Sequence, residues 1–392
     1  MQRTAFAEAQ QLYVRKASAG YLAFIPPPLP PAITLSTELV ARLSDADRAL
    51  GELAGAGRTL PNPHLLSQAL IRREAVLSSR IEGTHATLSE LALFELEPSR
   101  AHDPDDVREV ANYVRAADFV MDPDRHFPLS LPLLKQAHAI LMEGARGRHA
   151  TPGEFRVTQN WIGPSGAVID NATYVPPSPD ELWACLDAFE KYLHAESDLP
   201  PLLRIAAIHY QFEAIHPFLD GNGRVGRLLV VMLLIEWGLL PAPLLDLSAY
   251  IEPRRDRYYD GLLRVSTQGD WANWFDFFLE AIANQARDAV GRATQIQSLR
   301  DHYRDRVATA RSSGLLPRLV DELFRLPAMT LGHARDVLGV THRAATVNVE
   351  RLVEVGVLSE ISRTGKQRFF IATDIINVIE GRPLTDSGQL PT

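Results

Sequence analysis

Residues 216–227 read HPFLDGNGRVGR, and this stretch decides the fold and the chemistry that the sequence predicts. Pro217 disfavours the α conformation at His216, so a preceding helix should end there and present the imidazole on a loop. The GNG run at 221–223 can adopt backbone angles at which consecutive N–H groups point inward and bind an anion. The following GRVGRLLVVMLLIEW predicts a helix, whose N-terminus attracts phosphate through its free N–H groups and its dipole.

The side chains of this stretch favour chemistry on a phosphate. Arg224 and Arg227 are three residues apart, so both should emerge on one face of the first helical turn. Asp220 is a hard oxygen ligand, placed where a Mg²⁺ that bridges phosphates would sit. With His216 to take a proton from a hydroxyl, the set suits phosphoryl or nucleotidyl transfer. The alternative, a glycine-rich turn in which Asp220 caps the next helix, explains one or two of these residues but not the whole set.

The composition is that of an ordinary globular protein and argues against several other classes. The chain has 392 residues, 46% of them hydrophobic and 22% charged, which leaves room for two or three domains. Its net charge of −8 argues against bulk electrostatic binding to nucleic acid or to an anionic membrane. The single cysteine, Cys185, excludes an internal disulfide and fits a reducing compartment.

Neither the N-terminus nor the longest apolar run is typical of a membrane or export segment. The first residues have no apolar core of the signal-peptide kind. The run at 228–240 is interrupted by Glu236 and stopped by Pro241, so it is too short to span a bilayer and predicts a buried helix. We therefore expect a cytoplasmic protein without membrane contact.

The hydrophobic pattern predicts a mainly α fold. Residues 1–60 should form a proline-rich strap (YLAFIPPPLPPAI), extended over the surface rather than offered to a proline-binding domain, and then a helix. Residues 61–295 should form an all-helical core with one exception, a β-hairpin over about 157–176. Two β-prone runs, 157–162 and 172–175, separated by Gly and Pro, predict this hairpin. A charged linker helix is expected over 296–314.

The hydrophobic pattern changes in the C-terminal part, and the new pattern predicts a small α+β module. Over 315–381, three short helical segments precede an alternating stretch around a Thr364-Gly365 turn, which resembles a winged helix-turn-helix, and 382–392 should be a flexible tail. Between Arg318 and Glu380 eight Lys or Arg balance eight Asp or Glu, which is unlike a free-standing DNA binder. A docking or dimerisation module for proteins is therefore favoured over a DNA-binding one.

The stretch HPFLDGNGRVGR resembles the signature of the Fic (filamentation induced by cAMP) family, His-x-Phe-x-Asp/Glu-Gly-Asn-Gly-Arg-x-x-Arg, and fills every fixed position. The resemblance implies a helical core that binds ATP with Mg²⁺, transfers AMP to a hydroxyl side chain of a protein and releases pyrophosphate. It makes His216 the general base and Asp220 the Mg²⁺ ligand. It assigns the phosphates to the loop and both arginines, namely Gly221, Asn222, Gly223, Arg224 and Arg227. Relatives that transfer the terminal phosphate carry Lys at the second glycine, so Gly223 favours AMP.

Two further segments resemble parts of the same family. GEFRVTQNWIG with TYVPPSP is similar to the flap, a hairpin that aligns the target by strand addition, and places Thr173 and Tyr174 near the nucleotide. RDRYYDGLL is similar to a segment whose tyrosines contact the adenine end, here Tyr258 and Tyr259, because aromatic faces stack on bases. A tyrosine pair on a helix can also simply be half-buried. One relative has Asn at the position of Ser266, which leaves that contact open.

SSRIEGT, at 78–84, resembles the family's inhibitory motif, Ser/Thr-x-x-x-Glu-Gly/Asn, and implies an inhibitory helix over about 63–83. Its motif residues are Ser78, Glu82 and Gly83. A carboxylate at a helix C-terminus is disfavoured by the helix dipole and should seek a cation, and the family suggests Arg227. That pair would occupy the arginine that the γ-phosphate needs, which makes Glu82 part of the ATP site. Without the signature, the same residues could be any helix end with Gly83 as its cap.

The sequence thus predicts a protein adenylyltransferase that is restrained by Glu82 and uses ATP and Mg²⁺. Its partner would be a Ser, Thr or Tyr hydroxyl of another protein or of the chain itself, and a homodimer is left open. One alternative is an enzyme of the same fold that removes AMP, because in some relatives of the family the same glutamate positions a water. The resemblance would give this role to Glu82, with His216 as the acid. Another is a DNA-binding regulator whose Fic core is a sensor, against which the intact signature argues.

Overall fold

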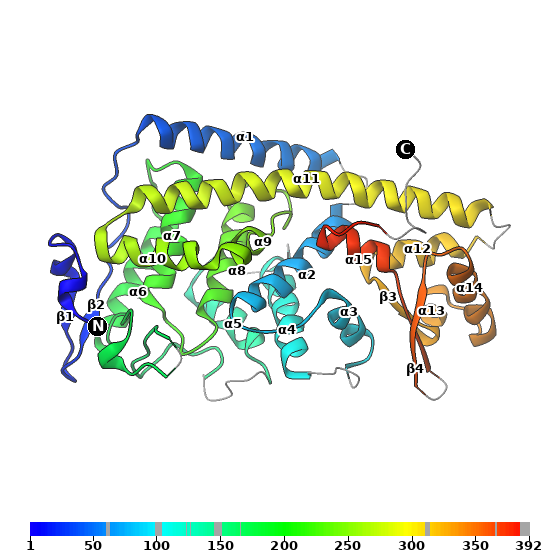
Figure 1. The fold of residues 1–392 in the computed structure, drawn as a ribbon, viewed down its shortest axis with the longest axis horizontal. Helices are drawn as coiled ribbons and strands as arrows, with labels where there is room; N and C mark the ends of the chain where they lie inside the picture. The colour runs from blue at the N-terminus through cyan, green and yellow to red at the C-terminus, as the bar shows by residue number, and fades with distance from the viewer. Residues whose placement is uncertain are drawn as a thin grey trace.

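Helices make up most of this chain, as its hydrophobic pattern predicts (Figure 1). The computed structural model describes residues 1–59, 63–98, 104–122, 124, 125, 127–144, 151–164, 166–309, 314–364 and 367–384. Of these, only the backbone is described at 63–65, 104, 309 and 362–364. No helix within the described ranges is long and apolar enough to cross a membrane.

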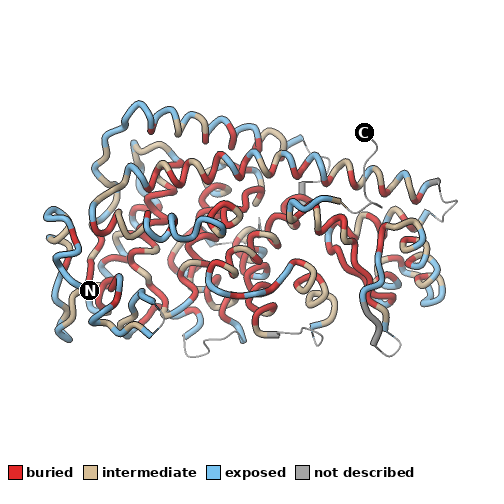
Figure 2. The backbone as a smooth tube through the Cα atoms, in the orientation of Figure 1, coloured by how far each residue is buried: buried red, intermediate tan, exposed pale blue. Residues whose placement is uncertain are grey.

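Two buried helices, α7 (Pro201–Ile215) and α8 (Asn222–Glu236), form the centre of the core and pack on each other. Both are apolar on nearly all sides, which is the pattern of a helix without a solvent face. Around them lie α2 (Pro63–Ile81), α3 (Leu88–Leu96), α4 (Pro104–Val120), α5 (Leu131–Leu141), α6 (Pro179–His194), α9 (Ser248–Ile251), η5 (Glu252–Arg254) and α10 (Arg255–Gln268). Figure 2 shows the resulting concentration of buried backbone along these helices.

Two long helices run side by side along one edge of the molecule (Figure 1). They are α1 (Thr37–Thr59) and α11 (Trp271–Thr309), and α11 continues for 39 residues from the core to the C-terminal module. The boundary that we expected at 295/296 falls inside α11. The expected linker helix is thus the continuation of α11 to Thr309, and residues 310–313 lie outside the described ranges.

The N-terminal segment contains more structure than the expected strap. Two short 3-10 helices, η1 (Arg3–Ala5) and η2 (Gln10–Tyr13), precede an antiparallel pair, β1 (Val14–Lys16) and β2 (Leu22–Phe24). Strands of three residues are too short for alternation to reveal them in the sequence. Residues 25–36, which hold the prolines, form neither helix nor strand. The N–H of Phe24 donates to the carbonyl of Val175 at 2.9 Å, so the N-terminal segment is hydrogen-bonded to the flap.

The predicted two-stranded flap is wrong in its detail. Residues 162 and 174 form one isolated antiparallel bridge, with N–O distances of 2.8 and 3.0 Å between Ile162 and Tyr174, and the described residues from 157 to 176 contain no strand. A short 3-10 turn, η4 (Ile169–Asn171), lies between them. The Gly and Pro residues between the two β-prone runs disfavour a longer ladder of hydrogen bonds between them. The flap is therefore a pair of loops joined at one point.

The C-terminal module has the predicted three helices and hairpin. They are α12 (Leu316–Arg325), α13 (Leu331–Leu338), α14 (His342–Glu354), β4 (Ser359–Thr364) and β5 (Gln367–Ile371). Sequence reasoning missed β3 (Ala328–Thr330), which pairs with β5, and α15 (Thr373–Glu380). The winged-helix assignment remains our interpretation of this order. The predicted tail lies outside the described ranges from residue 385 onward.

A chain of ion pairs links α2 to this module. Arg73 of α2 lies 2.6 Å from Asp246 and 2.8 Å from Asp288 of α11. Asp288 also pairs with Arg292 at 2.6 Å, and Arg292 donates to the carbonyls of Val378 and Ile379 at the end of α15. A cation at that end satisfies carbonyls that have no partner within the helix. The module is thus joined to α2 through buried polar contacts.

Replacing Arg73 with Met should destabilise the protein strongly. The side chain of Asp246 is fully buried, and loss of its cation leaves a buried carboxylate without a counter-ion. We expect the free energy of unfolding in urea to fall by about 3–5 kcal/mol. Arg287→Met is the matched control, because the Arg287–Asp45 pair is solvent-exposed and should cost less than about 1 kcal/mol. Equal losses in the two variants would contradict this assignment.

Candidate active site

His216 ends α7 in the left-handed region, with φ 49° and ψ 62°. This conformation is uncommon outside glycine, and here it turns the chain sharply before Pro217. The ring Nδ1 lies 3.3 Å from the carbonyl of Glu213. Because a carbonyl can only accept, Nδ1 carries the proton and Nε2 is the basic nitrogen. Burial, together with the charge of Arg156, lowers the pKa of His216 to about 4, so the ring is neutral at pH 7.

The loop after His216 presents the start of α8 as an anion site. Gly221 has φ 76° and precedes the helix, and the first helical hydrogen bond runs from the N–H of Val225 to Gly221. The N–H groups of 222–224 therefore precede the helical ladder and point toward an incoming anion. The side chain of Asn222 does not join them, because its amide exchanges two 2.8 Å hydrogen bonds with the backbone of Phe218. Asn222 closes the loop and offers the anion only its backbone.

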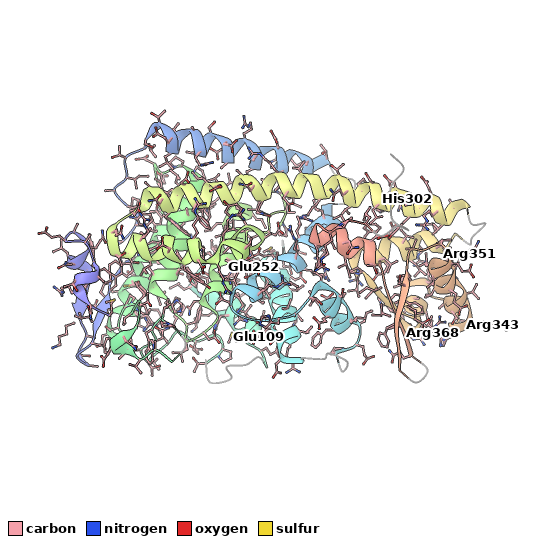
Figure 3. The ribbon with its side chains drawn as sticks, in the orientation of Figure 1. Glu109, Glu252, His302, Arg343, Arg351 and Arg368 are labelled. Carbon is pink, nitrogen blue, oxygen red and sulfur yellow. The ribbon has the colours of Figure 1, made fainter. Side chains whose placement is uncertain are left out.

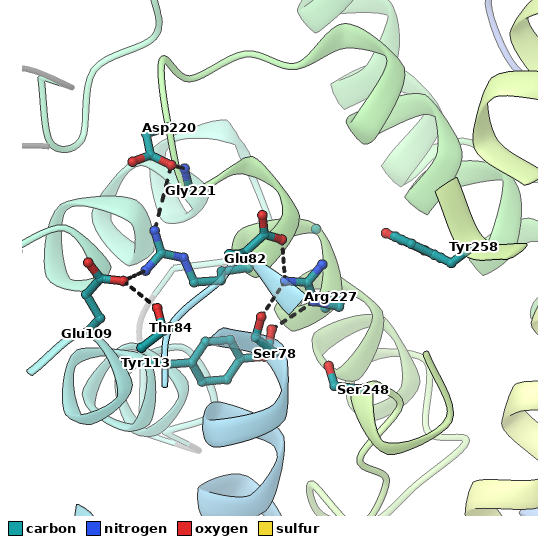
Figure 4. A network of polar contacts seen from close by, with 12 residues as sticks. Ser78, Glu82, Thr84, Glu109, Tyr113, Asp220, Gly221, Arg227, Ser248 and Tyr258 are labelled. Atoms are coloured by element: carbon teal, nitrogen blue, oxygen red, sulfur yellow. Dashed lines mark hydrogen bonds and ion pairs between the residues drawn. The ribbon is translucent and has the colours of Figure 1, made fainter. Parts of the chain in front are cut away.

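Arg227 and Glu82 form the expected ion pair (Figure 4). The Nη2 of Arg227 lies 2.7 Å from a carboxylate oxygen of Glu82, and the guanidinium also donates to the hydroxyl and carbonyl of Ser78 at 2.8 and 2.9 Å. Arg227 is fully buried, whereas the Glu82 side chain is 33% exposed. α2 ends at Ile81, and Gly83 turns the chain at φ 95°. The inhibitory-motif residues thus meet the second signature arginine.

Glu82 also covers the N-terminus of α8. A Cβ added at Gly223 would lie 2.3 Å from the nearest Glu82 oxygen and 2.9 Å from Nη1 of Arg227. The carboxylate therefore rests against the first turn of α8, where the missing side chain of Gly223 leaves room for it. This is the position that a phosphate would take at this helix end. The Glu82 carboxylate therefore lies where the N-terminus of α8 favours a negative charge.

Arg224 departs from the expected arrangement. It is buried and donates to Glu109 of α4 at 3.1 Å, and the hydroxyl of Thr84 donates to the same Glu109 oxygen at 3.0 Å (Figure 4). Arg224 and Arg227 therefore point to different neighbours, α4 and α2. A spacing of three residues leaves two side chains some 60° apart around a helix, which is enough to separate them here. No pattern in the sequence indicated Glu109.

Asp220 lies at the edge of this arrangement. One carboxylate oxygen accepts from the N–H of Gly221 at 2.6 Å and lies 3.8 Å from Arg224, while the side chain remains 54% exposed. Among the described residues no group of three or more His, Cys, Asp or Glu could hold a metal ion.

A cavity of about 610 Å³ brings the remaining predicted residues together. This volume is typical of a small-molecule site. Its lining includes Glu82, Thr173, Tyr174, Glu213, His216, Gly223, Arg227, Tyr258, Tyr259 and Ser266. The lining does not include Asp220, Gly221, Asn222 or Arg224.

The aromatic residues of the cavity are mostly fixed by their hydroxyls. Tyr174 donates to the carbonyl of Ala214 at 2.7 Å, and the hydroxyl of Tyr258 lies 2.9 Å from the Nε2 of His209. Tyr258 is buried, whereas Tyr259 is 44% exposed. Tyr259 therefore presents an exposed aromatic ring at the cavity, whereas Tyr258 is buried and held in position through its hydroxyl.

Sequence reasoning missed Glu213, which lies one helical turn before His216 and lines the cavity. Burial raises its pKa to about 8, against the opposing effect of Arg227, so the carboxyl is mostly protonated at pH 7. A Cβ at Gly226 would lie 2.3 Å from a Glu213 oxygen, so the glycine makes room for this side chain. A lone Glu on an apolar helix was the one available signal.

Comparisons with known proteins agree with this arrangement. Residues 128–234 match the Fic/DOC family, and residues 40–122 match the Fic/DOC family N-terminal region. Over 120 residues, the chain is 36% identical to the protein adenylyltransferase Fic of Drosophila yakuba and 37% identical to that of Culex quinquefasciatus. These matches cover 30% of this chain and 21% of each relative, so the chain spans about a fifth of their length.

Solved structures share the fold. A Fic family protein from Desulfovibrio desulfuricans superposes with a TM-score of 0.56 at 21% identity, covering 88% of this chain and 98% of that one. A Fic domain signalling protein from Bacteroides thetaiotaomicron gives 0.51 at 18% identity, covering 65% of this chain and 97% of that one. The signature loop, the helices around it and both family matches agree that residues 40–234 carry the Fic/DOC N-terminal and Fic regions, so this is a Fic domain protein.

Proposed function

We propose that this chain transfers AMP from ATP to a Ser, Thr or Tyr hydroxyl of a protein, with release of pyrophosphate, and that Glu82 restrains the reaction. One observation carries the proposal. The Glu82 carboxylate pairs with Arg227 at the N-terminus of α8, in the same cavity as the neutral His216. The curated relatives named as adenylyltransferases support the same reaction class.

The cavity suits ATP when Glu82 is displaced. The N–H groups at the start of α8 and the guanidinium of Arg227 would hold the phosphates, and the exposed ring of Tyr259 would contact the base. In the state described here the carboxylate occupies the phosphate position. ATP must therefore break a hydrogen-bonded ion pair to bind productively, which lowers its apparent affinity.

The donor set near the phosphates fits Mg²⁺. This ion is usually held by one or two carboxylates together with substrate phosphates and waters, so Asp220 alone is sufficient. Its exposed side chain, oriented by the N–H of Gly221, supplies that carboxylate. Bound there, Mg²⁺ would neutralise charge on the phosphates and on the departing pyrophosphate.

His216 is the group that accepts the proton. Its Nδ1–H is directed to the carbonyl of Glu213, so Nε2 would take the proton of the target hydroxyl. The hydroxyl oxygen then bonds to the α-phosphorus as the bond to pyrophosphate breaks. The exposed side chains of Trp161 and Ile162 in the flap border the cavity, where they would contact the target segment. Removal of AMP would use the same residues in reverse and remains the second candidate.

A DNA-binding function receives less support. Figure 3 labels Arg351 and Arg368 on the C-terminal module. Both are paired with acids, Arg368 with Glu350 and Glu360 at 2.8 and 2.7 Å and Arg351 with Glu354. Phosphate contacts require cations that are free to displace the counterions condensed on DNA. Docking to proteins or a second copy of the chain accords better with this neutral surface.

Glu82→Gly should raise AMP transfer by about 10- to 100-fold. It removes the carboxylate that competes with phosphate for Arg227, a charge-assisted hydrogen bond worth about 1.5–3 kcal/mol. The measurement follows label on protein from ATP carrying the isotope at the α- or the γ-phosphate, with Mg²⁺. Label should come from the α-phosphate alone, and His216→Ala should abolish it.

Glu143→Gly is the matched control for this variant. Glu143 also lies just after a helix, two residues beyond the end of α5, and pairs with an arginine, Arg115, but this pair is exposed and neither residue lines the cavity. It should leave transfer unchanged. Label from the γ-phosphate would make the protein kinase-like, and equal labelling by wild type and Glu82→Gly would remove the inhibitory role of Glu82.

The pH dependence of transfer should reflect a base with a lowered pKa. Burial holds the pKa of His216 near 4, so the ring stays deprotonated and active as the pH falls from 7 to 5.5. Loss of Glu82, whose charge raises that pKa, should extend the active range further. We therefore expect the kcat of Glu82→Gly to change less than twofold between pH 7 and 5.5. A histidine with the ordinary pKa would lose about eightfold over this range, and such a loss would contradict the burial argument.

A further inference from the structure

The backbone of the catalytic loop is held by one buried residue of the flap, Arg156. Its N–H donates to the carbonyl of Pro217 at 2.9 Å, and its Nε donates to the carbonyl of His216 at 2.9 Å. Its Nη2 reaches the carbonyl of Ile215 at 3.4 Å. Three consecutive carbonyls, with that of the base in the middle, therefore accept hydrogen bonds from Arg156.

Asn160, four residues later on the same arm of the flap, extends this contact. Its side-chain amide donates to the carbonyl of Phe218 at 2.8 Å and to that of His216 at 3.4 Å. The carbonyl of His216 thus accepts from both flap residues. Nη2 of Arg156 also donates to the carbonyl of Pro177 on the other arm of the flap. The two arms and the catalytic loop therefore share one set of hydrogen bonds.

Burying Arg156 only to fill space would be unfavourable in free energy. It is 2% exposed, and the hydrogen bonds of its guanidinium within the described ranges all end on backbone carbonyls. A buried cation without a carboxylate in contact is costly, and burial lowers its pKa to about 10. An apolar side chain could fill the same space without this cost, but it would leave the carbonyls of Ile215 and His216 without these donors and keep only the backbone N–H bond to Pro217.

The orientation of these carbonyls matters because His216 adopts a left-handed backbone conformation. A left-handed residue other than glycine costs about 1–3 kcal/mol and persists only where its surroundings determine it. The peptide after His216 is the one whose carbonyl Arg156 and Asn160 hold. A shift of about 1 Å in a catalytic group can cost about 100-fold in rate.

We propose that Arg156, assisted by Asn160, is a positioning residue that fixes His216 in its left-handed conformation and ties the base to the flap that receives the target. The inference rests on the proposed AMP transfer for its kinetic consequence. It makes the flap more than a docking edge, because the same arm that faces the target also holds the base in register. Arg156 and Asn160 act on the reaction only through His216.

The test introduces Arg156→Gln into the Glu82→Gly background and separates kcat from KM. We expect kcat to fall about tenfold or more, with KM for ATP within twofold, because no described contact of Arg156 reaches the phosphate site. Arg156→Lys retains the charge but has a single ammonium group in place of the planar guanidinium. Its kcat should therefore lie between that of the parent and that of Arg156→Gln. Thermal unfolding checks that each variant folds. If Arg156→Gln does not fold, Asn160→Ala replaces it and should lower kcat at least about threefold.

Arg204→Gln is the matched control. Arg204 lies on α7, and its guanidinium likewise binds three carbonyls, those of Tyr192, Leu193 and Ala195, but at the far end of the helix from His216. Its loss removes the same kind of interaction without touching the catalytic loop. It should leave kcat unchanged, whatever its effect on stability.

A second readout does not depend on transfer. The nitrogen chemical shifts of His216 report which ring nitrogen carries the proton, and this should be Nδ1 in the parent and a mixture of both nitrogens in Arg156→Gln. If Glu82→Gly transfers no AMP, the proposed function fails, and the tautomer still decides this inference. An unchanged tautomer in folded Arg156→Gln, or a kcat within twofold of an active parent, would overturn it.

Discussion

The ion pair between Glu82 and Arg227 is the constraint around which the rest of this structure is arranged. It places a carboxylate against the N-terminus of α8, where N–H groups and the helix dipole favour negative charge. Gly223 must lack a side chain for the carboxylate to fit, and Ser78 must face Arg227 to accept hydrogen bonds from its Nε and Nη2. The features that make the site attractive to phosphate are those that make it attractive to Glu82. Under the proposed function, restraint and AMP transfer therefore depend on the same residues.

Glu82 can act in this way only if α2 is held in place. Along α2, Arg73 joins Asp246 and Asp288, and through Arg292 this network reaches the end of α15 in the C-terminal module. Apolar contacts add to the connection, because Ala92 of α3 packs against Leu326 and Ala328. The helix that leads into Glu82 is thus anchored to the C-terminal module.

The sequence could predict most of the helical architecture from local rules, and the main features of the site from its resemblance to the Fic signature. Pro217 and the glycines determine where α7 ends and α8 begins, and the signature with its upstream motif led directly to Glu82 and Arg227. The failures concern side chains whose partners lie far away in the chain. Spacing alone could not reveal that Arg224 turns to Glu109, that Asn222 closes its own loop, or that Arg156 holds the catalytic carbonyls. The flap failed because a single bridge leaves too little alternation to identify.

A crystal structure of Glu82→Gly with Mg²⁺ and a non-hydrolysable ATP analogue would test the central claim most directly. The account predicts the γ-phosphate within hydrogen-bonding distance of Arg227, over Gly223 at the start of α8, in the space that the carboxylate leaves. It also predicts the α-phosphate facing His216. A γ-phosphate bound elsewhere, with Arg227 held only by Ser78 and the start of α8 unoccupied, would contradict the idea that Glu82 stands in for a phosphate.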